Sequence, residues 1–175
     1  DDGAVAGFGR AYLDLLARAV PGAETVTDKS IQTHLVIGLV ARALPQARIL
    51  VVRRDPRALG LSIYRNVFAP GTHLYAYDQA DIAAYVATFE KMMAFWRGAL
   101  PGRFTEIRYE DLVADPEPQT RALVAAAGLD WEDACLSFHE TERQVATLSI
   151  QQVRQPIHAG AAGGWRKHEA DLAPM

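Results

Sequence analysis

The segment from Arg48 to Asn66, RILVVRRDPRALGLSIYRN, constrains the fold of this chain more than any other segment. Residues 49–52 are an uninterrupted run of leucine and β-branched residues, which is too short for a helix with a solvent-facing side. Runs of this kind are typical of strands in the middle of a parallel sheet, with both faces buried. The segment therefore predicts a central strand of an α/β fold.

A helix is expected directly after this strand. Asp55 can cap the helix N-terminus, and Pro56 suits the first turn, where no amide hydrogen is needed. Residues 57–68 have a helical pattern, and the residues available to face the sheet are Leu59, Leu61, Ile63, Val67 and Phe68. The strand and the helix thus meet at a tight turn that contains Arg53 and Arg54.

This turn predicts an anion site. Arg54 brings a cation to the carboxyl end of the strand, and the start of the following helix carries partial positive charge. Ligands of parallel sheets bind at this edge, and a phosphate is the anion that we expect there. Ser62 lies about two helical turns further on, so its hydroxyl shares the ligand only if Arg54 reaches back along the helix. The alternative is a salt-bridged arginine and an ordinary surface serine.

A similar turn is expected earlier in the chain. Residues 24–27 are compatible with a short strand, and an apolar helix is expected over residues 31–44, with Lys29 between them. Two consecutive β–α units with right-handed crossovers place the carboxyl ends of their strands at one edge of the sheet. Lys29 and Arg54 are therefore expected on the same rim.

The rest of the chain is expected to consist mainly of helices. Their ranges are 4–20, 79–100, 115–127 and 131–138, with a strand over 104–109, an ordered loop over 149–164 and a last helical piece over 165–172. The apolar stripes are Phe8, Tyr12, Leu15 and Leu16 in the first helix, and Ile82, Tyr85, Val86, Phe89, Met93 and Trp96 in the second. Acidic residues such as Glu106 and Glu110 are expected on solvated faces.

Composition narrows the class of protein. A chain of 175 residues fits one domain, and no apolar run approaches the ~20 residues of a membrane span. The single cysteine, Cys135, excludes an internal disulfide, and the five histidines lack metal-ligand spacing, so no metal is expected. A net charge of −3 gives no reason to expect a nucleic-acid partner. No signal-peptide pattern is present, which favours a cytoplasmic location.

Six motifs occur in an order that resembles one family of enzymes. They are Asp28-Lys29, ALPQARILVVRRDPRALGLS, RYEDLVADPE, GLDWEDACLSFHETER, SIQQVRQP and GGWRKHEADLAP, and they cover nearly the whole chain. Together they resemble the PAPS-dependent sulfotransferases, especially the bacterial branch that is similar to tyrosylprotein sulfotransferases. The resemblance implies an α/β fold like that of P-loop NTPases, with a parallel sheet flanked by helices.

The resemblance also implies roles for individual residues. Arg54 and Ser62 fall where the family holds the 3′-phosphate of the nucleotide, and Tyr109 falls near the adenine. Lys29 falls near the transferred sulfuryl group, where a cation stabilises charge on the bridging oxygen. The alternatives are an ordinary core tyrosine at 109 and a solvated lysine at 29.

Two further segments complete the implied nucleotide site. One is a loop that wraps the nucleotide and contains Ser149, Gln152 and Arg154. The other covers the 3′-phosphate and contains Trp165, Arg166 and Lys167. Gly164 stands where the tyrosylprotein branch has a lysine, and whether Arg166 or Lys167 replaces that lysine stays open.

One part of the family pattern is missing. Family members have a loop rich in glycine, serine and threonine after their first strand, and this loop holds the 5′-phosphosulfate. Residues 7–10 lie inside a helical pattern without that cluster. We therefore expect one N-terminally truncated domain over residues 1–175 that lacks its first β–α unit. The usual base belongs near the missing loop; His34 is either a replacement base or a packed core histidine.

The expected function is transfer of a sulfuryl group from PAPS to a hydroxyl or amine of a small molecule or peptide, with PAP as product. The 175 residues alone are expected to have reduced activity or none, and to self-associate through the face that the missing unit would cover. One alternative is a truncated, non-catalytic remnant that binds a nucleotide or a partner. A P-loop kinase-like enzyme is a further alternative, against which the absent GxxxxGK[ST] motif speaks.

Overall fold

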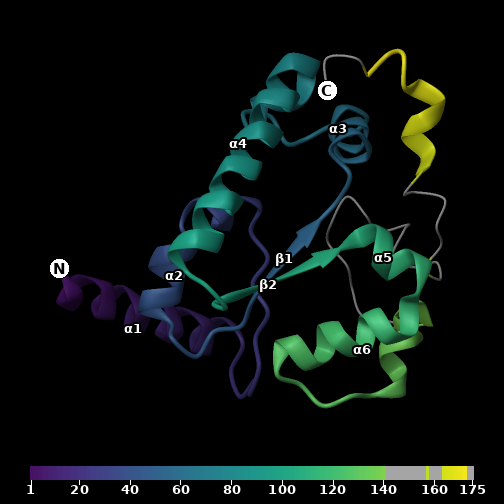
Figure 1. The fold of residues 1–175 in the computed structure, drawn as a ribbon. Helices are drawn as coiled ribbons and strands as arrows, with labels where there is room; N and C mark the ends of the chain where they lie inside the picture. Colours follow the sequence, from purple (N-terminus) through teal and green to yellow (C-terminus); the bar gives the residue numbers. More distant parts are fainter. Residues whose placement is uncertain (141–156, 158–162, 173–175) are drawn as a thin grey trace. The chain divides into compact units, whose positions relative to one another are not determined.

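The computed structural model describes residues 1–140, 157 and 163–172, which belong to two compact units. The first unit comprises residues 1–49 and 87–104, and the second comprises residues 50–86 and 105–175. Helix α4 (Gln79–Ala99) begins in the second unit and ends in the first (Figure 1).

A small parallel sheet confirms the predicted α/β class. Its strands are β1 (Ile49–Arg53) and β2 (Phe104–Arg108), and helices follow both (Figure 1). The expectation that β1 is buried on both faces is wrong, because Val52 is 60% exposed. Strand β2 is the hydrogen-bonding partner of β1, but the described elements leave the sheet uncovered at Val52.

The turn before Lys29 differs from the prediction. Residues 24–27 form no strand and are exposed throughout, because a strand needs a neighbour to pair with and no segment in the described part of the chain pairs with these four residues. The helix expected over 31–44 is divided into η1 (Ile31–Leu35), a 3₁₀-helix, and α2 (Ile37–Ala43). His34 Nδ1 lies 2.8 Å from the Ile31 carbonyl oxygen, which an α-helix would use for the amide of residue 35.

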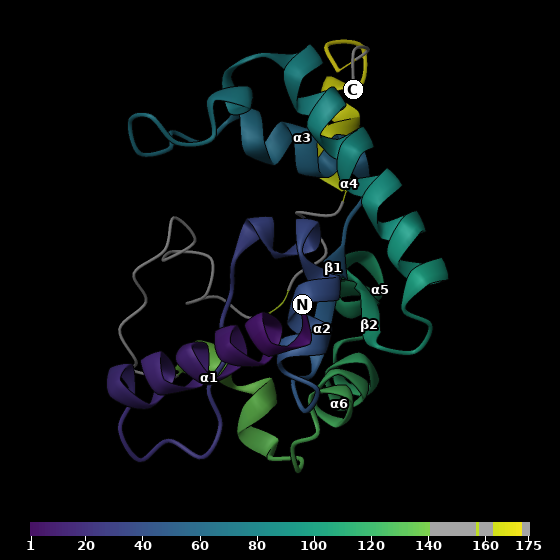
Figure 2. The same cartoon turned by 90° about the vertical axis from the view of Figure 1, so that its left-hand side faces the viewer.

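Helix α1 (Asp2–Ala19) forms as predicted, and the Asp1 carboxylate caps it by accepting from the Ala4 amide at 2.8 Å. Its predicted apolar stripe is only partly the buried face, since Tyr12 and Leu16 are half-buried whereas Phe8 is 45% exposed and Leu15 is 54% exposed. Gly9 is buried instead, next to the Ala43 carbonyl group at the end of α2. Helices α1 and α2 lie side by side in Figure 2.

Helix α4 confirms its prediction in both start and apolar side. Asp78 caps it by accepting from the amides of Ala80 and Asp81, at 2.8 and 3.0 Å. The buried residues are Ile82, Val86 and Met93, which all belong to the predicted stripe.

Helix α3 (Pro56–Tyr64) is shorter than predicted. The side-chain Nδ2 of Asn66 donates to the Ser62 carbonyl oxygen, which in a longer helix would accept from the backbone amide of Asn66. Val67 lies beyond the helix and is 79% exposed, so it does not face the sheet. A turn at residues 69–72 and the 3₁₀-helix η2 (Leu74–Tyr77) then lead to α4.

Within the described residues, further short helices belong to the second unit. They are α5 (Tyr109–Ala114), α6 (Pro116–Ala127), and three 3₁₀-helices, η3 (Asp133–Leu136), η4 (Phe138–Glu140) and η6 (Gly164–His168). Gly128 ends α6 with φ of 74°, as predicted, whereas the helix expected over 131–138 consists of two 3₁₀ turns. The loop expected over 149–164 lies mostly outside the described residues. No helix in the described ranges has the length and apolar character to cross a membrane.

Candidate anion site at the end of β1

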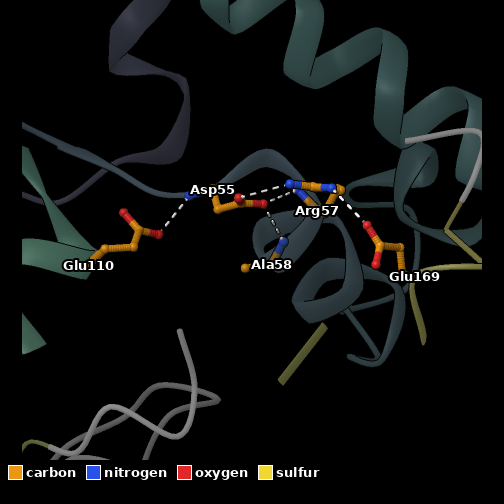
Figure 3. Close-up of polar contacts among 5 residues, drawn as sticks. All are labelled: Asp55, Arg57, Ala58, Glu110 and Glu169. Carbon is orange, nitrogen blue, oxygen red and sulfur yellow. Dashed lines mark hydrogen bonds and ion pairs between the residues drawn. The ribbon is translucent and has the colours of Figure 1, made fainter. Parts of the chain in front are cut away.

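The turn between β1 and α3 is fixed by two carboxylates (Figure 3). The Asp55 carboxylate accepts hydrogen bonds from the amides of Arg57 and Ala58, at 2.9 and 3.3 Å. The Asp55 amide in turn donates to Glu110 Oε1 at 2.8 Å. Asp55 is therefore the predicted N-cap, and Glu110 joins α5 to the same turn.

These bonds decide how this edge can hold an anion. Pro56 has no amide hydrogen, and the amides of Asp55, Arg57 and Ala58 already donate to carboxylates. The amides at the start of α3 thus donate to the capping carboxylate and not to a ligand, whereas the sequence predicted that the start of this helix would help to hold the anion. Binding of an anion here must depend on side chains.

Arg54 and Tyr109 come together at this edge. Arg54 Cζ lies 4.8 Å from the centroid of the Tyr109 ring, which is a cation–π distance, and both residues are half-buried. Arg54 follows β1 and Tyr109 follows β2, so the carboxyl ends of two parallel strands supply the pair. Ser62 is half-buried in α3, the helix that begins at this turn.

Arg53 forms a salt bridge, which is the alternative that the sequence offered to anion binding by an arginine at the end of the strand. Its Nη1 lies 2.5 Å from Glu106 Oε1 on β2, and both side chains are largely buried. Glu106 and Glu110 were expected on solvated faces, and both expectations are wrong. Their partners are 53 and 55 residues away in the chain, so no local pattern signals the contacts.

The C-terminal segment, residues 163–172, packs on α3. Trp165 is only 5% exposed and forms a cluster with Ala58, Leu61 and Leu172. Arg166 Cζ lies 5.2 Å from the Trp165 ring centroid, and Lys167 is exposed. A pocket of about 400 Å³ opens where this segment meets α3 and the start of α4; its lining is Leu61, Tyr64, Arg65, Gln79, His168, Asp171 and Leu172.

Sequence reasoning did not single out Arg57, the residue that links α3 to the C-terminal segment. Its Cζ lies 3.6 Å from the Trp165 ring centroid, and its Nη1 lies 3.3 Å from Glu169 Oε1. The only sequence signal is the arginine after RDP, which is also an ordinary residue for the first turn of a helix.

The predicted residues outside this edge are placed as follows. Lys29 is exposed and belongs to the first unit, so its place on a rim shared with Arg54 stays a prediction. Ser149, Gln152 and Arg154 lie outside the described residues. His34 is buried, with its ring edge-on to Phe89 at 5.2 Å, which is the packed arrangement of the two that the sequence left open.

The loop that carries Lys29 is attached to α1. The Tyr12 hydroxyl donates to the Asp28 carboxylate, one residue before Lys29. This hydrogen bond, together with partial burial and the nearby negative charge, raises the pKa of Tyr12 to about 12. Among the described residues, no other side-chain hydrogen bond reaches residues 24–30.

The fold and this edge define an α/β protein with arginines at the carboxyl end of a parallel strand. The family model described as "Sulfotransferase family" matches residues 4–133, well over half of the chain. The chain therefore belongs to the sulfotransferase family, which confirms the resemblance at the level of the family.

Three relatives illustrate this membership. The chain is 31% identical over 166 residues to an uncharacterized protein of Aquifex aeolicus (strain VF5), a match that covers 94% of this chain and 22% of that protein. It is 30% identical over 113 residues to the omega-hydroxy-beta-dihydromenaquinone-9 sulfotransferase Stf3 of Mycobacterium tuberculosis, covering 61% and 29%. It is 27% identical over 179 residues to a protein-tyrosine sulfotransferase of Drosophila melanogaster, covering 93% and 36%. The chain thus spans between about a fifth and two fifths of these relatives.

Proposed function

We propose that this chain binds the 3′-phosphorylated adenosine nucleotide PAP at the carboxyl edge of β1, as part of a protein that transfers sulfuryl groups. The observation that carries the proposal is Arg54 stacked on Tyr109 at this edge. The edge has a cation and an aromatic ring next to each other, which suits a phosphate attached to a nucleoside. Membership of the sulfotransferase family supports the same ligand.

Three side chains bind two parts of the nucleotide in this proposal. The guanidinium of Arg54 donates two directed, charge-assisted hydrogen bonds to the 3′-phosphate, and the Ser62 hydroxyl adds a third. The backbone amides of α3 take no part, because the cap uses them. Tyr109 keeps the Arg54 side chain in place and offers a ring edge to the adenine.

For the reaction, the donor PAPS supplies the sulfuryl group when it is bound. Lys29 stabilises the negative charge that develops on the phosphate oxygen left behind. The acceptor is a hydroxyl or amine of a small molecule or peptide. A cytoplasmic location is part of the proposal, since a single cysteine fits a reducing compartment.

The test is a comparison of PAP and AMP binding by isothermal titration calorimetry. We expect PAP to bind at least about tenfold more tightly than AMP, and Arg54→Ala to abolish this preference, because a hydrogen bond to a charged group contributes ~1.5–3 kcal/mol. Equal affinity of the wild-type chain for the two nucleotides would remove the 3′-phosphate site.

Arg108→Ala is the matched control for this test. Arg108 also ends a strand of the sheet, but it is exposed and pairs with Asp111 at 3.6 Å. This variant should keep the preference for PAP. A sulfuryl-transfer assay with PAPS then separates the two roles, since binding of PAP without transfer would leave a nucleotide-binding role only.

A further inference from the structure

Arg57 contacts three groups that belong to two segments, and Figure 3 shows two of them, Asp55 and Glu169. Its guanidinium lies 3.6 Å from Asp55 Oδ2 at the start of α3 and 3.3 Å from Glu169 Oε1 in the C-terminal segment. Its Cζ lies 3.6 Å from the centroid of the Trp165 ring. Arg57 thus provides the polar contact that joins the C-terminal segment to α3, the helix that follows Arg54.

The C-terminal segment depends on α3 for its position. Its regular part is the five-residue 3₁₀-helix η6, and helices this short are not stable on their own. Trp165 and Leu172 are its two buried apolar residues in the described chain, and both pack against α3. The place of the segment is therefore set by this small apolar cluster and by Arg57.

Charge makes the contribution of Arg57 specific. Residues 163–172 contain two basic residues, Arg166 and Lys167, and two acidic residues, so the segment has no net charge, but the two basic side chains would repel the arginines at the start of α3. Glu169 and Asp55 oppose this repulsion by pairing with Arg57, and the indole of Trp165 adds a cation–π contact. Arg57 thereby pairs an acidic residue of the segment with the arginine-rich turn, which Arg166 and Lys167 alone would repel.

We propose that Arg57 is a positioning residue that holds the C-terminal segment on α3, so that Arg166 and Lys167 are available to the 3′-phosphate. This inference rests on the proposed function for its ligand. Arg57 itself does not bind the nucleotide, since its guanidinium is already engaged by Asp55, Glu169 and Trp165. Its substitution therefore alters recognition of the 3′-phosphate without altering recognition of the rest of the nucleotide.

Four variants of the full chain test this inference: Arg57→Gln, Arg57→Lys, Glu169→Gln and Arg121→Gln. The last is a matched control, because Arg121 also stacks on a tryptophan, with its Cζ 4.0 Å from the Trp131 ring centroid, and pairs with Glu117 at 2.9 Å. Two quantities are measured for each variant. They are hydrogen exchange of the amides of residues 164–172 without nucleotide, and the affinities for PAP and for AMP.

For Arg57→Gln, we expect several-fold faster exchange in residues 164–172. We also expect about a tenfold loss of PAP affinity, equivalent to about 1.4 kcal/mol, with AMP affinity nearly unchanged. Arg57→Lys should restore part of both, since lysine keeps the charge but not the planar fork. Glu169→Gln should change both quantities in the same direction by less, and Arg121→Gln should change neither.

The inference is overturned if Arg57→Gln leaves the ratio of PAP to AMP affinity unchanged, or lowers both affinities equally. If Arg57→Gln does not fold, Glu169→Gln decides, because Glu169 is exposed and its variant leaves α3 intact. Failure of the proposed function has a different result, which is that the wild-type chain does not prefer PAP. The exchange data then still determine whether Arg57 holds the segment.

Discussion

The Tyr12 hydroxyl and the Asp28 carboxylate form the contact that attaches the Lys29 loop to α1. The pKa of Tyr12 is raised from 10.0 to about 12, because Asp28 stabilises the protonated hydroxyl. A raised pKa in the folded chain means that this contribution to stability is complete below pH 10 and is lost as the pH rises through about 12.

Tyr12→Phe should therefore lower the free energy of unfolding at neutral pH. The expected loss is about 0.5 kcal/mol, the low end for a hydrogen bond, because solvent reaches this site. Urea unfolding at neutral and at strongly alkaline pH checks it, and the difference from wild type should shrink at the higher pH. Tyr64→Phe, at an exposed tyrosine, is the control and should have no such effect. A loss that is independent of pH would argue against the role of the hydrogen bond.

Local sequence predicted the residues whose partners are near in the chain. Asp55 and Asp78 were assigned as N-caps, and Gly128 as a C-cap, because capping depends on amides within three residues or on one positive φ. Glu106 and Glu110 were misassigned, because their partners lie across the sheet. Arg54 and Tyr109 follow the two strands and meet because strand ends in a parallel sheet lie at one edge, while their roles in binding stay predictions.

At the scale of elements, helix existence was predictable, and the buried face was predicted correctly for α4 but only in part for α1. The apolar pattern located α1 but gave only half of its buried face, since Tyr12 and Leu16 are half-buried while Phe8 and Leu15 are exposed. Helix α1 packs closely against the end of α2 because Gly9 has no side chain, and no hydrophobic pattern signals such a contact. The strand expected at residues 24–27 failed for a related reason, because a strand depends on a partner that local sequence does not specify.

Gly9→Ala should destabilise the chain by about 1–3 kcal/mol, the cost of an overpacked contact. A Cβ at this position would overlap the Ala43 carbonyl oxygen and lie 3.1 Å from the carbonyl carbon, and backbone cannot rotate away as a side chain can. Gly7→Ala is the control in the same helix, because the nearest atom to its Cβ is Arg10 Nη2 at 4.0 Å. It should stabilise α1 by ~0.5–1 kcal/mol. Thermal or urea unfolding distinguishes them, and equal effects would contradict the close packing of α1 and α2.

At the scale of the whole molecule, the sequence predicted the family and the α/β class, while the motifs needed for the complete site lie in separate places. Arg54, Tyr109 and Trp165 belong to one unit, and Lys29 to the other. Motif order along a chain identifies a family, because order survives sequence change. It does not determine the distance between side chains in different units, which depends on long-range packing.

The isolated chain should self-associate through its sheet. Within the described residues the sheet has two strands, so each strand leaves one edge unpaired, and Val52 of β1 is exposed. Sedimentation velocity at a series of concentrations should detect association, and Val52→Lys should reduce it. Val67→Lys, at a valine outside the sheet that is 79% exposed, should not. A monomer at all concentrations would contradict this expectation.

The two carboxylates that fix the turn before α3, Asp55 and Glu110, have a consequence for how this edge changes in evolution. Because the backbone donors of the turn serve the fold, ligand preference belongs to a few exchangeable side chains around it. Exchange of those side chains alters which anion is selected and leaves the conformation of the turn unchanged. Selectivity and folding are thereby assigned to different atoms of the turn.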